Sequence, residues 1–148
     1  MMLVDIENFT GTPSPSTWDV TQAIQCLEGL VPSLGESHVV VACSHRAAPT
    51  VAFAWRAARH IWRSGPDGAD LALLSVLANE RVHERFESVT ICSGDGIFAD
   101  IAGWLGGAGV NVNVISLAGH LSTRLRIAAA SVQEVAFPTV AATSGESA

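Results

Sequence analysis

Residues 89–106 read VTICSGDGIFADIAGWLG, the pattern of a strand followed by a helix. The apolar run 89–93 predicts a buried strand, and the segment from Asp95 to about Gly106 predicts a helix. The glycine-rich residues 106–109 end that helix, and residues 110–116 predict the next strand. Strands joined by a crossover helix run parallel, so this stretch favours an α/β fold.

The same alternation extends through most of the chain. Further strands are expected over 3–6, 38–43 and 60–63. Further helices are expected over 17–30, 47–58 and 69–81, with a short helix after Gly119. The predicted fold is a three-layer α/β/α sandwich, Rossmann-like, with a mainly parallel central sheet and right-handed crossovers.

Length and composition favour one domain. The chain has 148 residues, of which 49% are hydrophobic, enough for a single core over 1–138, with 139–148 expected to be a frayed tail. Its apolar runs are far shorter than the roughly 20 residues of a membrane span. No secretion signal precedes the first strand, so we expect a cytoplasmic protein without membrane contact. Apolar helix surfaces in so small a domain are compatible with a homodimer.

Three acidic residues stand where the predicted fold brings distant segments together. Asp5 ends the first strand, Asp95 follows the fourth, and Asp70 lies in the first turn of a helix. The carboxyl ends of parallel strands line one crevice, so these carboxylates can converge there. A single carboxylate at a helix start is often only a capping group. Three at one crevice favour a divalent-cation site.

Four segments carry a resemblance to a known family. They are LVDIENF at 3–9, GADLAL at 68–73, ICSGDGIFAD at 91–100 and VNVIS at 112–116. In order and spacing they resemble the signatures of NYN domains, which belong to the PIN-like nucleases, and the likeness runs from residue 3 to about 129. The resemblance implies a Rossmann-like sandwich, Mg²⁺ or Mn²⁺ held by clustered acids, and hydrolysis of RNA phosphodiester bonds. Matched position by position, it implies Asp5, Asp70 and Asp95 as catalytic metal ligands and Asn8 as a polar companion of Asp5.

One position departs from the family pattern. The family usually has a second acid two residues after the third-motif Asp, and this chain has Ile97 there. Asp100 is an imperfect substitute, because five helical residues turn it well away from Asp95 in angle. We expect it in the outer shell at most. Ser93 either donates a hydrogen bond at the site or only shapes the turn before Asp95.

The charge of the chain bears on a nucleic-acid partner. A net charge of −6 argues against a surface that coats nucleic acid, yet a few arginines beside the site are enough to grip RNA. His45 and Arg46 follow the second strand and should stand at the rim of the crevice. Arg56 and Arg59 lie three apart on a predicted helix and are further candidates for holding phosphates.

Other functions remain open from the residues alone. A degenerate PIN-like module that binds RNA or a protein without catalysis would explain Ile97. Residues 94–100 also resemble the acidic fourth motif of haloacid-dehalogenase-type phosphatases, and residues 5–7 loosely resemble their first. That family normally uses a phosphate-binding Lys, and all eight basic residues of this chain are Arg. A metal-dependent endoribonuclease is the favoured interpretation.

Overall fold

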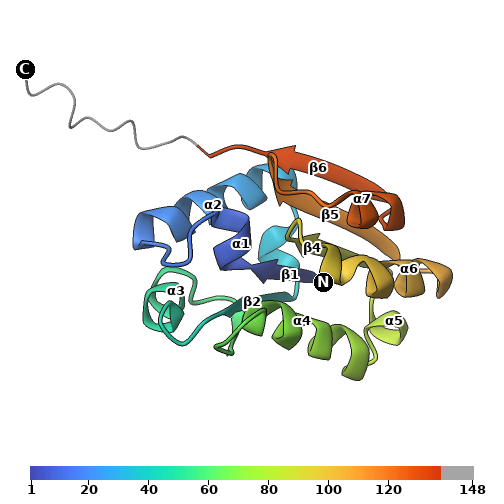
Figure 1. The fold of residues 1–148 in the computed structure, drawn as a ribbon, viewed down its shortest axis with the longest axis horizontal. Helices are drawn as coiled ribbons and strands as arrows, with labels where there is room; N and C mark the ends of the chain where they lie inside the picture. Colours follow the sequence, from blue (N-terminus) through green and yellow to red (C-terminus); the bar gives the residue numbers. More distant parts are fainter. Residues whose placement is uncertain (138–148) are drawn as a thin grey trace, which may run out of the picture.

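The computed structural model describes residues 1–137, and its centre is one sheet of six parallel strands (Figure 1). The strands are β1 (Met2–Asp5), β2 (Val39–Cys43), β3 (Arg59–Trp62), β4 (Ser88–Cys92), β5 (Asn111–Leu117) and β6 (Ser131–Val135). They lie in the order β3-β2-β1-β4-β5-β6, and each neighbouring pair is parallel. The predicted α/β sandwich is therefore confirmed, with a sheet that is parallel throughout. The expected tail at 139–148 lies outside the described residues.

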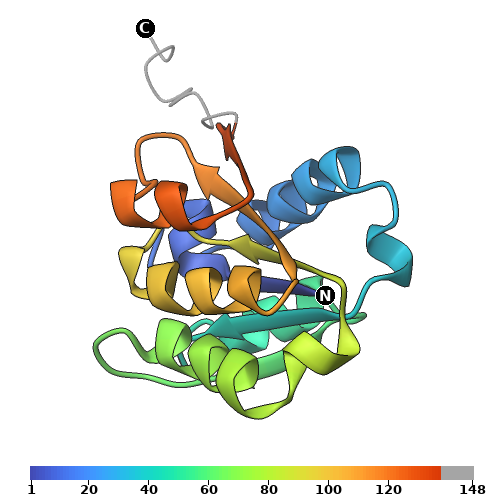
Figure 2. The same ribbon diagram turned by 90° about the vertical axis from the view of Figure 1, so that its right-hand side faces the viewer.

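Helices cover the sheet on both faces, which makes three layers (Figure 2). On one face lie α1 (Ile6–Thr10), α2 (Thr17–Leu30) and α3 (Ala48–Ala54). On the other lie α4 (Gly68–Asn79), α5 (Val82–Arg85), α6 (Ala99–Gly107) and α7 (Thr123–Ala128). Side chains alternate along each strand, so Met2 and Val4 enter the first core while Leu3 enters the second. This double burial explains why the central strands are apolar on both sides.

One predicted helix is shorter in the structure, and one edge strand was not predicted. The helix expected over 47–58 ends at Ala54, because Trp55 leaves the helical conformation and is buried in the first core. Arg59 is consequently the first residue of β3. The edge strand β6 escaped prediction because its sequence, SVQEV, is largely exposed and carries little apolar signal.

The first strand has the expected length but begins and ends one residue earlier, and it leads directly into a helix. β1 ends at Asp5, whose side chain caps α1 by accepting a hydrogen bond from the Asn8 N–H at 3.2 Å. Two short 3₁₀ helices, Leu34–Glu36 and Gly96–Phe98, complete the connections. No helix within residues 1–137 is both long enough and apolar enough to span a bilayer.

Candidate metal centre at the switch point of the sheet

The predicted acidic residues lie at the point where the strand order reverses. The chain proceeds from β1 to β2 and β3 on one side, and then returns to place β4 on the other side of β1. Asp5 is the last residue of β1, and Asp95 lies just after β4. The crevice at the carboxyl ends of such neighbouring strands is the usual ligand site of open α/β sheets.

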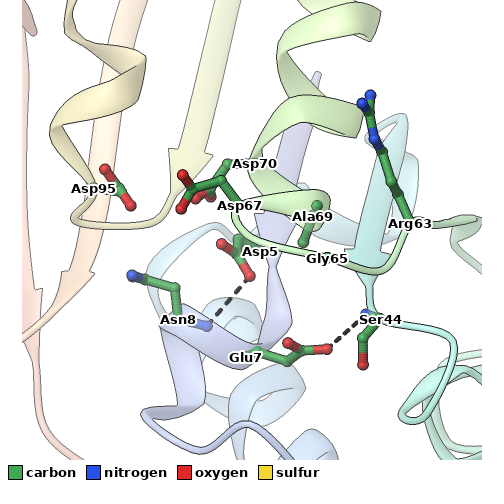
Figure 3. A pocket seen from close by; sticks show the side chains of 11 residues that line it. Asp5, Glu7, Asn8, Ser44, Arg63, Gly65, Asp67, Ala69, Asp70 and Asp95 are labelled. Carbon is green, nitrogen blue, oxygen red and sulfur yellow. Dashed lines mark hydrogen bonds between the residues drawn. The ribbon is translucent and has the colours of Figure 1, made fainter.

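A third segment brings two more carboxylates to this crevice. The crossover from β3 places the first turn of α4 beside the ends of β1 and β4, and Asp67 and Asp70 lie there (Figure 3). One carboxylate oxygen each of Asp67, Asp70 and Asp95 lie within 4.8 Å of one another. Asp5 lines the same pocket, whose volume is about 280 Å³. The structure therefore brings Asp5, Asp70 and Asp95 together, as the sequence predicted, and adds Asp67.

Backbone and side-chain contacts hold the turn that carries Asp95. The Gly94 N–H donates to Asn8 Oδ1 at 3.1 Å, and the Asp95 N–H donates to Ser93 Oγ at 3.2 Å. Asp95 Oδ1 accepts a hydrogen bond from the Ile97 N–H at 2.9 Å. Asn8 and Ser93 thus position the turn.

Gly94 allows this turn to pack closely against the next crossover. A Cβ atom on Gly94 would lie 2.1 Å from the His120 carbonyl oxygen and 2.4 Å from Ser116 Oγ. The Ser122 N–H in the same crossover donates to the Gly94 carbonyl at 2.8 Å. The residue between Ser93 and Asp95 must therefore lack a side chain.

Glu7 also lines the pocket but is already engaged. Its Oε1 accepts a hydrogen bond from the Ser44 N–H at 2.6 Å, which ties the end of β2 to α1 (Figure 3). Glu7 therefore supports the wall of the pocket and adds negative charge beside Asp5.

Burial and crowding change the protonation of the two deepest carboxyls. Burial raises the pKa of Asp70 from 3.8 to about 9, and a hydrogen bond with Asp5 and the charges of Asp5 and Asp95 act in the same direction. Burial also raises the pKa of Asp5, although hydrogen bonds with Asp70 and the Asn8 N–H oppose that rise. These raised pKa values favour one proton held by the Asp5–Asp70 pair at neutral pH when no cation is bound.

The donor set fits a hard divalent cation. Asp70 is 5% exposed, and its Oδ1 is buried with no hydrogen-bond partner among the described residues. A buried oxygen without a partner costs stability unless a proton or cation satisfies it. Carboxylate oxygens from three segments are the ligands that Mg²⁺ and Mn²⁺ prefer.

Two residues at the pocket were missed from the sequence. Asp67 adopts a left-handed conformation, with φ of 56°, in the turn before α4. The Asp67-Gly68 pair predicts a turn at this position, but it does not predict where the Asp67 side chain points. Among residues 1–137, Arg63, directly after β3, is the only basic residue that lines the pocket. Its guanidinium points away from the carboxylates (Figure 3).

Asp100 does not join the site, and that expectation is corrected. Its side chain is 94% exposed on α6 and pairs with Arg124 at 3.2 Å. The helical rotation between residues 95 and 100 directs it toward α7 instead of the crevice.

The two arginines that were predicted to hold phosphates from one helix, Arg56 and Arg59, lie in different segments. Arg59 begins β3, at the opposite end of that strand from the crevice, and pairs with Glu80 through contacts of 2.6 and 2.8 Å. Arg56 lies over the Phe53 ring at 5.4 Å in the loop after α3. The shared helical face expected for Arg56 and Arg59 does not exist, because α3 has already ended. The structure therefore removes both from the predicted site.

His45 and Arg46 do lie in the exposed turn after β2, at the carboxyl edge of the sheet. The His45 ring hydrogen-bonds to Ser64 Oγ at 2.8 Å through Nδ1. Neither residue lines the acidic pocket itself. Contact with RNA stays a prediction for both.

Comparison with known proteins adds the fold only. No family model and no curated protein matches this chain. The chain is similar to the crystal structure of a protein of unknown function from Vibrio parahaemolyticus, with a TM-score of 0.62 and 15% sequence identity over 90% of each chain. At that identity, the likeness shows a common architecture.

Proposed function

We propose that this protein is a metal-dependent ribonuclease of the NYN type, a member of the PIN-like nucleases, that hydrolyses RNA phosphodiester bonds. One observation carries the proposal: Asp5, Asp67, Asp70 and Asp95 converge at the switch point, and the buried Asp70 Oδ1 has no partner among residues 1–137. Placing four carboxylates together destabilises a fold unless a ligand offsets their repulsion. Retaining them is therefore consistent with a bound cation.

The four aspartates would hold Mg²⁺ or Mn²⁺, with Asp5 and Asp70 at the base of the pocket and Asp67 at its more exposed edge. When bound, such an ion lowers the pKa of a coordinated water and offsets charge on the leaving oxygen of the phosphodiester. Asn8 and Ser93 keep Asp95 in place through the Gly94 turn. Asp70 and Asp5 give up their shared proton when the cation binds, which makes binding weaker at low pH.

The test is cleavage of labelled single-stranded and structured RNAs in Mn²⁺ or Mg²⁺. EDTA and Asp95→Asn should each abolish cutting, whereas Asp100→Asn, which removes an exposed carboxylate outside the pocket, should cut like the wild type. Circular dichroism should show that Asp95→Asn is folded. Cutting by Asp95→Asn at the wild-type rate would remove the nuclease assignment from this pocket.

A PIN-like module that binds RNA or a partner without catalysis is the second candidate, and Ile97 favours it. Ile97 occupies the position of the acid that the NYN resemblance leads one to expect, and it packs partly buried against the second core. Asp67 offers a replacement carboxylate from another segment, which favours retained activity. A folded protein that binds RNA but cuts none of the substrates in either metal would select the binding module.

A further inference from the structure

A second cavity adjoins the acidic pocket and shares one residue with it. This β3–α4 groove lies between the edge strand β3 and helix α4, has a volume of about 510 Å³, and includes Arg59, Arg63, Ser75 and Glu80 in its walls. Arg63 also lines the acidic pocket. The two cavities therefore meet at the Arg63 side chain, and a ligand that extended from the aspartates to the groove would pass this residue.

Arg63 is available to an anion. Within residues 1–137, no acidic side chain lies within ion-pairing distance of its guanidinium. Its backbone is held in place by the hydrogen bond that the Arg63 N–H donates to the Cys43 carbonyl at 3.0 Å. The Arg63 carbonyl also packs closely against Gly68, where an added Cβ would lie 2.3 Å from the carbonyl oxygen. The head group is exposed and points away from the carboxylates (Figure 3). A fixed backbone with a free guanidinium suits a phosphate outside the metal cluster.

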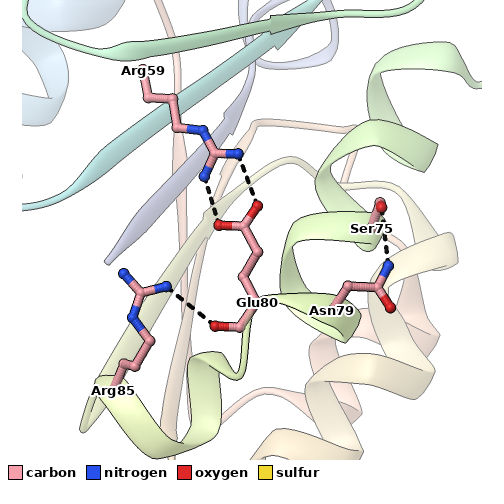
Figure 4. Close-up of polar contacts among 5 residues, drawn as sticks. All are labelled: Arg59, Ser75, Asn79, Glu80 and Arg85. Atoms are coloured by element: carbon pink, nitrogen blue, oxygen red, sulfur yellow. Dashed lines mark hydrogen bonds and ion pairs between the residues drawn. The ribbon is translucent and has the colours of Figure 1, made fainter.

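The far end of the groove is closed by an ion-pair network. Arg59 and Glu80 form a bidentate pair at 2.6 and 2.8 Å, and Arg85 donates to the Glu80 carbonyl at 3.2 Å (Figure 4). This pairing neutralises Glu80, so the groove does not present an unpaired carboxylate to an anion. Four residue steps separate Arg59 from Arg63, or roughly 13 Å at 3.3 Å a step. That is the length of about four stacked nucleotides at 3.4 Å each.

Hydrogen-bonding groups line the part of the groove between Arg59 and Arg63. Arg63 bonds toward β2, and in a parallel ladder alternate residues of an edge strand face outward, so the peptide groups of His60 and Trp62 point away from the sheet. On the other wall, Ser75 Oγ accepts from Asn79 Nδ2 at 3.1 Å and keeps its own proton to donate (Figure 4). These donors and acceptors suit the sugar and base edges of a single strand.

We propose that the β3–α4 groove binds the single-stranded RNA segment that flanks the scissile bond, with Arg63 holding the phosphate where that segment leaves the acidic pocket. The choice of RNA as occupant rests on the proposed function, and two observations support it: the two cavities share Arg63, and its guanidinium has no acidic partner within residues 1–137. Arg63 is a substrate-binding residue in this arrangement. Base recognition along the groove is then separate from metal binding.

The proposal is tested by fluorescence anisotropy with labelled oligouridylates of two to eight nucleotides, in EDTA, so that neither metal nor cleavage is needed. Arg63→Gln should weaken binding of the longer oligomers about tenfold or more, as expected for the loss of a charge-assisted hydrogen bond. The slope of log K against log salt should become shallower by about 0.7, which corresponds to one lost phosphate contact on a single strand. The matched control is Arg126→Gln, which should bind like the wild type. Arg126 pairs with Glu134 of β6, the edge strand opposite β3.

A second variant tests the groove itself. Ser75→Trp adds bulk from an exposed helix position and should weaken binding of six- and eight-nucleotide oligomers more than of dinucleotides. If Arg63→Gln and Ser75→Trp both bind RNA with wild-type affinity and salt slope, the groove assignment is overturned. Cleavage of RNA with that result would leave the nuclease proposal standing. Arg63-dependent binding without cleavage would instead support the groove and reject catalysis.

Discussion

Replacing Asp70 by Asn should remove most of the pH dependence of stability of the metal-free protein between pH 6 and pH 8. The Asp70 pKa is raised from 3.8 to about 9 in the folded state. Across this window the unfolded chain has lost the proton while the folded protein retains it, so raising the pH favours unfolding. The free energy of unfolding should fall by about 1.4 kcal/mol per pH unit, or about 3 kcal/mol over the two units.

The measurement is thermal denaturation in EDTA at pH 6 and pH 8, followed by circular dichroism. For a domain of this size, about 3 kcal/mol corresponds to a fall in Tm of roughly 6–12 °C for the wild type. Asp70→Asn has no proton to retain and should be more stable than the wild type at pH 8. Asp100→Asn should keep the wild-type dependence, because its exposed carboxylate lies outside the pocket.

Added Mn²⁺ completes this test. It should raise the Tm of the wild type at pH 8 by replacing the shared proton, and raise that of Asp70→Asn much less. If Asp70→Asn loses stability between pH 6 and pH 8 as steeply as the wild type, the reasoning is refuted, because the pH dependence would then arise from other groups.

Three further outcomes are expected. Gly94→Ala should lower the free energy of unfolding, measured in urea, by about 2–4 kcal/mol, because its Cβ would lie 2.1 Å from the His120 carbonyl oxygen. The control Gly106→Ala should be neutral or stabilising, because a Cβ there has no atom within 4 Å. Equal effects of the two substitutions would contradict the close packing of the Gly94 turn. Asn8→Ala should lower the free energy of unfolding by about 1–3 kcal/mol, because it leaves the buried Gly94 N–H unpaired, and it should reduce RNA cleavage. An Asn8→Ala protein as stable as the wild type would count against this contact. Titration of the protein with Mn²⁺ at pH 7 in weak buffer should release about one proton per protein, measured with an indicator dye. Asp70→Asn should release much less. If both proteins release the same number of protons, the proton belongs to another group.

The fold class could be predicted because its signals are local. Strands buried on both faces are apolar runs, and helices alternate with them, so the α/β sandwich is visible in the order of these patterns. β6 lacked that signal because edge residues are exposed, and α3 was predicted too long because helical periodicity does not reveal where a buried Trp55 turns the chain inward. The convergence of Asp5, Asp70 and Asp95 followed from topology, since parallel strands align their carboxyl ends.

Only the tertiary structure decided which other groups join them. Asp67 reaches the cluster because its turn adopts a left-handed conformation against the end of β3, and Asp100 is excluded by its rotation around α6. The raised pKa of Asp70 arises from burial and from carboxylates distant in sequence, and the β3–α4 groove arises from packing a helix beside an edge strand. The physical reason is one of range: hydrophobic periodicity and strand ends are properties of neighbouring residues, whereas burial, crowding and cavities exist only after distant segments have packed together.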